Sequence, residues 1–530
     1  MLQGHSIIDA ATQPASGPTF TAVNPATGES IEPVFHSASL DDLNTAARLA
    51  AEAFPLYAKI SGAKKAEFLR AIASGLEAIT EELVQRAHLE SGLPIPRLNG
   101  ELARTANQLR LFANIVEEGS WVQARIDPAL PDRNPLPRAD IRSMLRPLGP
   151  VAVFGASNFP LAFSVAGGDT ASALAAGNPV IVKAHPAHPG ASELVAHVIT
   201  RAAAACNLPA GVFALLFDAG TSIASALVQH PAIKAVGFTG SLRAGRALMD
   251  LAAARPDPIP CFTEMSSANP LVILPEALAS RGPAIATSLY DSYTLGVGQF
   301  CTKPGLVFLS AGIDGDDFAK KLQLRTRKGA GAVMLTEGIC GSFHSGLAQR
   351  KSHPHVQILA EAPFAEEQGF RAVPALLQTT GEALLAHPDL AHELFGPTTL
   401  LVRYTGRDQL LTLVNALEGQ LTASLHGTQA ELLANTDLVQ ILEQKAGRIL
   451  FNGFPTGVEV CHAMVHGGPY PATADSRFTS VGTQAIFRFA RPICFQDFPQ
   501  DALQDELKDS NPLRIWRLIN GDFLRDPLSS

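Results

Sequence analysis

Apolar residues recur every three to four positions over residues 40–120, which is the spacing of amphipathic helices. The stretch "SLDDLNTAARLAAEAF" begins with Ser39, a residue type that favours the N-cap of a helix, and "ARTANQLRLFANIVEEG" predicts another long helix. Residues 124–150 are rich in proline and charge, which favours an extended surface arm or hairpin. We therefore expect a helical region followed by an arm.

From residue 150 the pattern changes to short apolar runs that alternate with helical segments. "VAVFG", "PVIVKAH", "FALLF" and "IKAVGFTG" predict strands, and the segments between them predict helices rich in small residues. This alternation predicts a largely parallel, doubly wound sheet. A second α/β region is expected at about 270–460. The tail predicts a strand at "AIFRFARPICFQDFP" and a short helix at "PLRIWRLING".

Composition supports a globular protein with more than one core. The chain has 530 residues, of which 46% are hydrophobic and 17% charged. A net charge of −8 without a long basic run argues against nucleic acid or an anionic membrane as a partner. The N-terminus lacks the pattern of a secretory signal. The most apolar stretch is interrupted by Asn178, Pro179 and Lys183, so it does not predict a membrane span. Six scattered cysteines are typical of a reducing compartment, so we expect a cytoplasmic protein.

Three segments follow directly after predicted strands: "FGASNFP", "KAHPAHPG" and "FTGSLRAG". Ligands bind at the carboxyl ends of strands in an open parallel sheet, so these segments suggest a nucleotide site, although no GxGxxG occurs. Gly240 and Ser241 lie at a predicted helix N-terminus that suits a phosphate, or they simply shape a turn. Lys183 either binds a ribose hydroxyl or a 2′-phosphate, or it is solvated.

The stretch "GQFCTKPG" places Cys301 in a turn between two glycines, close to Lys303. A catalytic thiol needs such an approach and a nearby cation, but an inert turn cysteine fits the same letters. Glu264, in "TEMSSANP", is either a general base whose pKa is raised by burial or a helix cap. Asn158, in "GASNFP", either donates to an oxyanion or occupies an ordinary turn.

These motifs occur together in one order. "FGASNFPL", "VIVKAHPAHPG", "GFTGS", "TEMSSANP", "GQFCTKPG" and "ELFGP" resemble the aldehyde dehydrogenase superfamily over about residues 20–500. The closing stretch from "GRILFNGFP" to "FQDFP" is similar to an NADP-preferring branch. That branch includes dehydrogenases of 2,5-dioxovalerate (α-ketoglutaric semialdehyde) and of fatty aldehydes.

The resemblance implies an aldehyde dehydrogenase-like α/β fold with three parts. A Rossmann-type cofactor domain is expected at residues 1–123 and 149–265, and an α/β catalytic domain at 266–465. A β oligomerisation arm is expected at 124–148 and 480–500, followed by a C-terminal tail at 501–530. Such an arm implies a homodimer or a homotetramer.

The resemblance also implies a mechanism. Cys301 would attack the aldehyde, Asn158 would hold the oxyanion, and Glu264 would activate the water that hydrolyses the thioester. The implied cofactor residues are Ser157, Lys183, His185, Pro186, Gly240, Ser241 and Glu393. NAD-preferring members carry a glutamate where this chain has Pro186, so NADP is expected, with NAD as an alternative. Lys183 or His185 would then attract the 2′-phosphate.

For the small-molecule aldehyde substrate, the matched helix places Arg104 on the substrate tunnel, where a guanidinium would suit a carboxylate. A surface arginine is the alternative. Tunnel walls are expected at Phe163, Phe300 and Phe454, or these rings are ordinary core residues. The implied reaction is oxidation of 2,5-dioxovalerate to 2-oxoglutarate, and the alternative is oxidation of a medium or long fatty aldehyde.

Two other classes are weaker. A thiol hydrolase would use Cys301 or Cys461 with a histidine, but it leaves the nucleotide-edge segments unexplained. A zinc site on His462 and His466 is disfavoured by the Gly-Gly-Pro that follows and by the missing HExxH glutamate, so no metal is expected. A catalytically silent protein on this fold is disfavoured because Cys301, Glu264 and Asn158 are all present.

Overall fold

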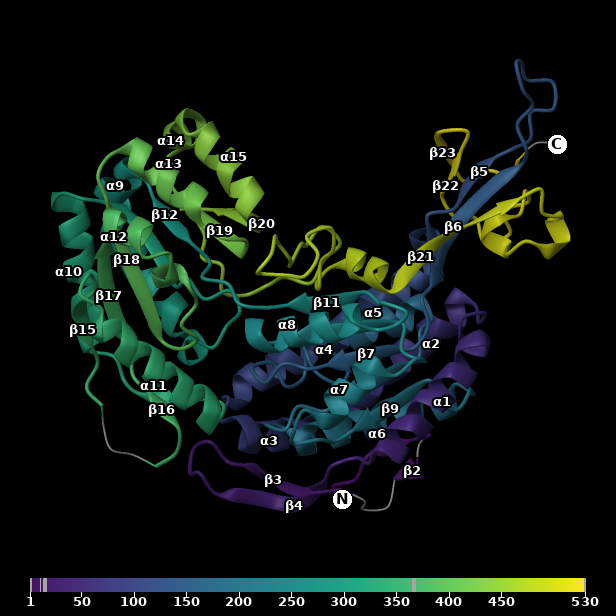
Figure 1. Cartoon of the computed structure of the whole chain (residues 1–530), viewed down its shortest axis with the longest axis horizontal. Helices are drawn as coiled ribbons and strands as arrows, with labels where there is room; N and C mark the ends of the chain where they lie inside the picture. Colours follow the sequence, from purple (N-terminus) through teal and green to yellow (C-terminus); the bar gives the residue numbers. More distant parts are fainter. Residues whose placement is uncertain (1, 10, 13–16, 365–367, 529–530) are drawn as a thin grey trace.

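A computed structural model describes residues 2–9, 11–12, 17–364 and 368–528. Its main features are two α/β lobes and an arm that projects from one of them (Figure 1). Each lobe is built on a seven-stranded sheet with helices on both faces, and the arm is a five-stranded sheet. This agrees with the predicted fold class.

The first sheet is the predicted doubly wound sheet. Its order is β11-β10-β7-β8-β9-β1-β2, and the five strands from β11 to β9 are parallel. The strands are β1 (Ile7–Ile8), β2 (Ala11–Thr12), β7 (Val151–Phe154), β8 (Val180–Lys183), β9 (Phe213–Leu216), β10 (Ala235–Thr239) and β11 (Cys261–Glu264). Val151 and Val153 face one core, whereas Ala152 and Phe154 face another. Both faces are covered, so the run is apolar throughout.

In the part of the chain that the structure describes, eight helices cover this sheet. Side chains of α2 to α6 fill the core on one face, and those of α1, α7 and α8 fill most of the core on the other. The helices are α1 (Leu40–Tyr57), α2 (Gly62–Ala78), α3 (Thr80–Ser91), α4 (Ile95–Glu118), α5 (Gly168–Ala176), α6 (Pro189–Ala205), α7 (Ser222–Gln229) and α8 (Leu242–Ala253). The predicted N-cap Ser39 is confirmed, because its hydroxyl accepts the Asp42 N–H while the Asp42 carboxylate accepts the Ser39 N–H.

The second lobe repeats the arrangement. Its sheet order is β15-β17-β18-β13-β12-β19-β20, parallel except for β15. The strands are β12 (Leu271–Ile273), β13 (Leu306–Ser310), β15 (Gln357–Glu361), β17 (Ala375–Thr380), β18 (Thr398–Tyr404), β19 (Gln420–His426) and β20 (Ala446–Phe451). The helices are α9 (Pro275–Thr294), α10 (Ile313–Arg327), α11 (Glu337–Ser352), α12 (Gly381–Ala386), α13 (Arg407–Ala416), α14 (Gln429–Ala434) and α15 (Thr436–Lys445).

The arm contains more of the C-terminus than the sequence predicts. Its order is β21-β6-β5-β22-β23, formed by β5 (Arg125–Asp127), β6 (Ile141–Pro147), β21 (Ala490–Gln496), β22 (Arg517–Ile519) and β23 (Asp522–Leu524). The predicted helix at "PLRIWRLING" is wrong, because this segment supplies β22, which pairs in parallel with β5. Ile515 and Ile519 are buried against Ile126 and Met144 of the arm.

Short pairs and turns complete the fold. β3 (Thr19–Val23) pairs with β4 (Ser30–His36), and β14 (Ala332–Val333) pairs with β16 (Arg371–Ala372). The 3-10 turns are η1 (Ser120–Val122), η2 (Leu295–Gly298), η3 (Pro388–Ala391), η4 (Thr483–Phe489), η5 (Gln500–Ala502) and η6 (Asp505–Leu507). Within the described ranges, every helix is too short or too polar to cross a membrane.

One long segment, residues 452–482, has no regular helix or strand and crosses from β20 back to the first lobe (Figure 1). We call it the crossing segment. It runs along the edge strand β11, where the Met265 N–H donates to the Ala472 carbonyl and the Ala474 N–H donates to the Thr263 carbonyl. Glu264 and Thr473 form an isolated antiparallel bridge there. The crossing segment therefore brings side chains from the end of the chain to the end of β11.

Candidate active site

The three segments predicted at strand ends lie at one edge of the first sheet. They follow β7, β8 and β10, which are neighbours in the order β10-β7-β8. The chain reverses direction across the sheet between β10 and β7, since β8 and β9 extend to one side of β7 while β10 and β11 extend to the other. This is the topological switch point at which α/β sheets bind ligands.

Cys301 lies in a turn between η2 and β13. The buried Asn269 amide holds this turn, since its Nδ2 donates to the carbonyl oxygens of Cys301 at 2.8 Å and Lys303 at 3.0 Å. Gly298 has a φ of 65°, and a Cβ there would lie 2.1 Å from the Gly396 carbonyl oxygen. The close approach of the Gly396 backbone therefore requires a glycine at position 298, independently of any ligand.

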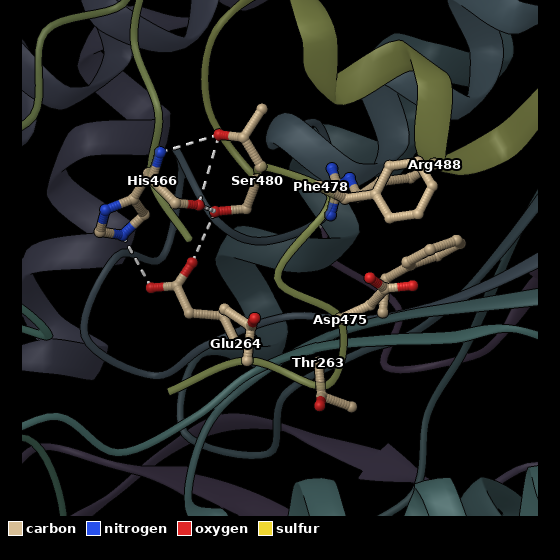
Figure 2. A pocket seen from close by; sticks show the side chains of 10 residues that line it. Thr263, Glu264, His466, Asp475, Phe478, Ser480 and Arg488 are labelled. Carbon is tan, nitrogen blue, oxygen red and sulfur yellow. Dashed lines mark hydrogen bonds and ion pairs between the residues drawn. The ribbon is translucent and has the colours of Figure 1, made fainter. Parts of the chain in front are cut away.

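Glu264 is the last residue of β11 and is 3% exposed. Its Oε1 lies 2.8 Å from Nε2 of His466, and its Oε2 accepts a hydrogen bond of 2.6 Å from the Ser480 hydroxyl (Figure 2). Burial alone would raise the pKa of Glu264, but His466, Ser480 and Cys301 together lower it below its usual value. The expectation of a raised pKa is therefore wrong, because the electrostatic interaction with His466 and the hydrogen bonds to the carboxylate outweigh its burial.

His466 also contacts the thiol. Its Nε2 lies 3.5 Å from Sγ of Cys301, and one donor atom from each of Cys301, Glu264 and His466 lies within 4.8 Å of the others. Burial and the Glu264 carboxylate raise the pKa of the Cys301 thiol well above its usual value. The Nδ1 atom of His466 is buried and, within the described chain, has no hydrogen-bond partner. A proton on Nε2 is therefore favoured, because it alone gives the ring a partner, the Glu264 carboxylate.

Sequence reasoning missed this role of His466. From the sequence, His466 is considered only as a zinc ligand together with His462, and that site is disfavoured. In the structure, His466 contacts Cys301 and Glu264. The side chains come from two segments that are far apart in the sequence: Glu264 from β11, and His466 and Ser480 from the crossing segment (Figure 2). A cavity of about 20 Å³, room for one water, lies beside Glu264 and is also lined by Asp475 and Arg488.

Asn158 connects the loop after β7 to the cysteine turn. Its side-chain Nδ2 donates to the Gln299 backbone carbonyl at 3.0 Å, and the backbone carbonyl of Asn158 accepts a hydrogen bond from Arg97 at 2.7 Å. The Arg97 guanidinium packs against the rings of both Phe159 and Phe300, 5.0 and 4.8 Å from their centres. Asn158 thus keeps one amide hydrogen for another acceptor, and Phe300 helps to join the two loops.

Arg104 lies on α4 and faces the same cluster. Its guanidinium stacks on Phe163 at 5.0 Å, and the Phe163 ring lies 6.2 Å from that of His466. Both terminal nitrogens of Arg104 are buried and have no hydrogen-bond partner among the residues described. Burial lowers its pKa, while the charges of Glu101, Cys301 and Glu264 act in the opposite direction. An anion would satisfy this guanidinium.

Phe454 lies at the edge of a core of the second lobe. Its ring packs on His426 at 4.9 Å, beside the core of the second lobe. Among the described contacts, none joins it to the cysteine cluster.

The predicted phosphate turn is an exposed helix start. Ser241 is the N-cap of α8 and accepts the Ala244 N–H, while Gly240 before it is exposed to solvent. Lys183 ends β8, and burial lowers its pKa, partly offset by Asp218. The N–H groups of α8 and the Lys183 ammonium are the donor types that a dinucleotide phosphate needs, so these residues fit one.

The other cofactor predictions fare unevenly. Nδ1 of His185 accepts the Ala187 N–H, and burial lowers the pKa of this ring well below its usual value. The His185 ring is therefore neutral at pH 7 and does not supply the positive charge expected of it. Pro186 follows it and is half-buried, as is Ser157 in the loop after β7.

Glu393 lies in the second lobe, near Lys303 of the cysteine turn. Burial raises its pKa to about 7, opposed by Lys303 and by hydrogen bonds from Ser266 and the Ser267 backbone. Lys303 is itself buried, which lowers its pKa to about 8, and its ammonium donates to the Leu394 and Thr398 carbonyls. Glu393 is thus held beside the segment that follows Glu264.

Comparison with known proteins decides the family. The family model described as "Aldehyde dehydrogenase family" matches residues 12–470. The chain belongs to the aldehyde dehydrogenase family. It is 52% identical over 521 residues to alpha-ketoglutaric semialdehyde dehydrogenase 2 of Azospirillum brasilense, covering 98% of this chain and 99% of that protein. It is 45% identical over 519 residues to the alpha-ketoglutaric semialdehyde dehydrogenase of Acinetobacter baylyi, covering 98% of each chain.

The fold is shared more widely than the sequence. The structure of betaine aldehyde dehydrogenase from Staphylococcus aureus superposes with a TM-score of 0.80 at 18% identity, covering 94% of this chain and 96% of that one. The predicted membership of this family is confirmed, and so is the predicted fold.

Proposed function

We propose that this aldehyde dehydrogenase oxidises 2,5-dioxovalerate to 2-oxoglutarate with NADP. The observation that carries the substrate is the buried, unpaired guanidinium of Arg104 beside Cys301 and Glu264. A carboxylate on the aldehyde would give it a charged partner. The names of the relatives from Azospirillum and Acinetobacter support the same substrate.

In the first half-reaction, the partly exposed thiol of Cys301 releases its proton to solvent. The sulfur then forms a bond to the aldehyde carbon, and the carbonyl oxygen becomes an oxyanion. The free amide hydrogen of Asn158 donates to that oxyanion. When bound, a nicotinamide would supply the acceptor for the hydride that leaves this carbon, and Cys301 would then hold the acyl group as a thioester.

In the second half-reaction, Glu264 accepts a proton from a water molecule. The water oxygen bonds to the thioester carbon, and the carbon–sulfur bond breaks to release the acid and the Cys301 sulfur. The lowered pKa of Glu264 keeps its carboxylate ionised near neutral pH, so it is ready to act as the base. Ser480 and His466 hold the two oxygens of that carboxylate.

Residues of both lobes would hold the dinucleotide. The turn at Gly240 and Ser241 would bind the pyrophosphate, and Glu393 would bind the nicotinamide ribose. Pro186 supports NADP, because no carboxylate stands there to repel a 2′-phosphate. With His185 neutral, Lys183 is the charge that would attract that phosphate.

We further propose a homodimer or homotetramer formed through the arm, whose strand β21 pairs with β6 and has a second edge available within the described sheet. All six cysteines are free thiols, which supports the proposal of a reducing, cytoplasmic environment.

The test is a panel of kcat/KM values for 2,5-dioxovalerate, succinic semialdehyde and hexanal, each with NADP and with NAD. We expect 2,5-dioxovalerate to exceed hexanal by more than about tenfold, and NADP to exceed NAD. Equal or better turnover of hexanal would favour the fatty aldehyde alternative. Ester or thioester hydrolysis with no aldehyde oxidation would favour the thiol hydrolase.

A further inference from the structure

Cys301, Glu264 and His466 form a set of three metal-type donors, one sulfur, one oxygen and one nitrogen. Their donor atoms lie within 4.8 Å of one another. Glu264 and His466 are nearly inaccessible, at 3% and 1% exposure, whereas Cys301 is partly exposed. A small ion could therefore approach from the side of the thiol.

Two of the three distances between donor atoms are close to those of tetrahedral zinc. Zinc bonds of about 2.3 Å to sulfur and about 2.0–2.2 Å to nitrogen and oxygen place neighbouring ligand atoms about 3.4–3.6 Å apart. The Cys301 Sγ to His466 Nε2 distance is already 3.5 Å. The Glu264 Oε1 to His466 Nε2 distance of 2.8 Å must open by only about 0.6 Å to reach the same geometry.

The local charges also allow a divalent ion. A Cys301 thiolate and the Glu264 carboxylate would together neutralise Zn²⁺; the thiol proton would leave, and the ring proton of His466 would move from Nε2 to Nδ1. The positive charges of Arg104 and Arg448 interact with Cys301 and oppose binding of a cation. The negative charge of Glu393 interacts with Cys301 and that of Glu459 with Arg104, and both favour binding of a cation. The thiolate and the carboxylate thus balance the charge of the ion itself.

The surroundings favour a reversible site over a permanent one. Ser480 fixes the second oxygen of Glu264, as an outer hydrogen bond does in zinc proteins. In contrast, Nδ1 of His466 has no such outer partner among the described residues, which weakens binding. Three protein ligands leave a fourth position for water.

We propose that Cys301, Glu264 and His466 bind Zn²⁺ reversibly, and that the ion inhibits the enzyme by occupying its nucleophile and its base together. Zinc and the aldehyde would then compete for the same thiol. The ion is an inhibitor here and has no part in oxidation. The proposal depends on the three side chains and not on which aldehyde is the substrate.

The direct test uses Co²⁺ as a spectroscopic substitute for zinc, added to protein freed of metal by chelation. We expect one Co²⁺ per chain, with visible bands of tetrahedral cobalt and a near-ultraviolet band from thiolate to cobalt. Added Zn²⁺ should displace it. His466→Gln should weaken binding by about tenfold or more, and Cys301→Ala should abolish the thiolate band.

The matched control is the double variant Cys461→Ala with His462→Gln, which removes another cysteine and histidine from the crossing segment but leaves the three donors intact. It should bind Co²⁺ as the unmodified protein does. Circular dichroism checks that each variant is folded. The proposal would be overturned if no thiolate band appeared. It would also be overturned if the band survived in His466→Gln but was lost in the control.

A second readout is inhibition. Zn²⁺ should raise the apparent KM for the aldehyde, and EDTA should restore activity. Because the cobalt spectrum needs no substrate, the zinc site can succeed even if the proposed substrate fails, and the substrate can succeed even if no cobalt binds.

Discussion

Replacing Arg104 with leucine removes the charge that we assign to the substrate carboxylate. The leucine keeps apolar contact with Phe163, so the ring retains a neighbour. The rest of the cluster, Cys301, Glu264 and His466, does not depend on a hydrogen bond from Arg104, because its terminal nitrogens have no partner among the described residues. The variant therefore isolates the effect of the guanidinium on the substrate.

The expected magnitude follows from the burial of this charge. Removing one partner of a buried ion pair costs about 3–5 kcal/mol, because the other charge is left buried and unpaired. At about 1.4 kcal/mol per tenfold change, the lower figure is a loss of roughly 100-fold in kcat/KM for 2,5-dioxovalerate. Hexanal has no carboxylate, so its kcat/KM should change by less than about threefold.

The same substitution should not destabilise the free protein. A buried guanidinium without a partner costs free energy in the absence of substrate, and leucine removes that cost. We therefore expect the melting temperature of Arg104→Leu to be equal to or higher than that of the unmodified enzyme. This is the pattern of a residue retained for function at the expense of stability.

The assay compares kcat/KM for both aldehydes, from the absorbance of the reduced cofactor, in Arg104→Leu and in Arg110→Leu. Arg110 lies on the same helix and forms an exposed ion pair with Glu77, so its loss should affect neither substrate. If Arg104→Leu lowered kcat/KM equally for both aldehydes, or for neither, the assignment of Arg104 to a substrate carboxylate would be refuted.

Three further predictions concern other parts of the site. The raised pKa of Cys301 means that its thiolate fraction grows with pH, so alkylation by iodoacetamide should accelerate through the neutral range without levelling off below pH 9; a plateau near pH 7 would contradict this. Asn269→Ala should cost about 1–3 kcal/mol in chemical denaturation, because buried carbonyls of the cysteine turn lose their donor, and a cost under about 0.5 kcal/mol would count against it. Pro186→Glu should lower kcat/KM for NADP by about tenfold or more by repelling the 2′-phosphate while sparing NAD, and unchanged selectivity would show that this position does not contact the ribose.

The sequence predicts the alternating strands and helices well because their signal is local. In β7, residues on both faces are apolar, and the covered sheet explains why. The predicted C-terminal helix was wrong because the conformation of this segment depends on a strand that is distant in the sequence. The segment around Ile519 pairs on one side with β5, nearly 400 residues earlier in the chain, and on the other with β23, which follows it directly.

The site could be predicted only in part. Cys301, Glu264 and Asn158 lie in motifs that can be read from neighbouring letters. His466 has no such signal, since its partner Glu264 is 202 positions away and the crossing segment has no regular structure. For the same reason the lowered pKa of Glu264 could not be foreseen, because it depends on His466 and Ser480.

The central claim is that Cys301 carries the acyl group and that Glu264 acts after it is formed. The most direct measurement is peptide mass mapping of Glu264→Gln, quenched in acid after mixing with 2,5-dioxovalerate and NADP. We predict one equivalent of reduced cofactor per active site and a Cys301 peptide heavier by the substrate less two hydrogens. The account would be contradicted by reduced cofactor with an unmodified Cys301, by the label on another cysteine, or by sustained turnover.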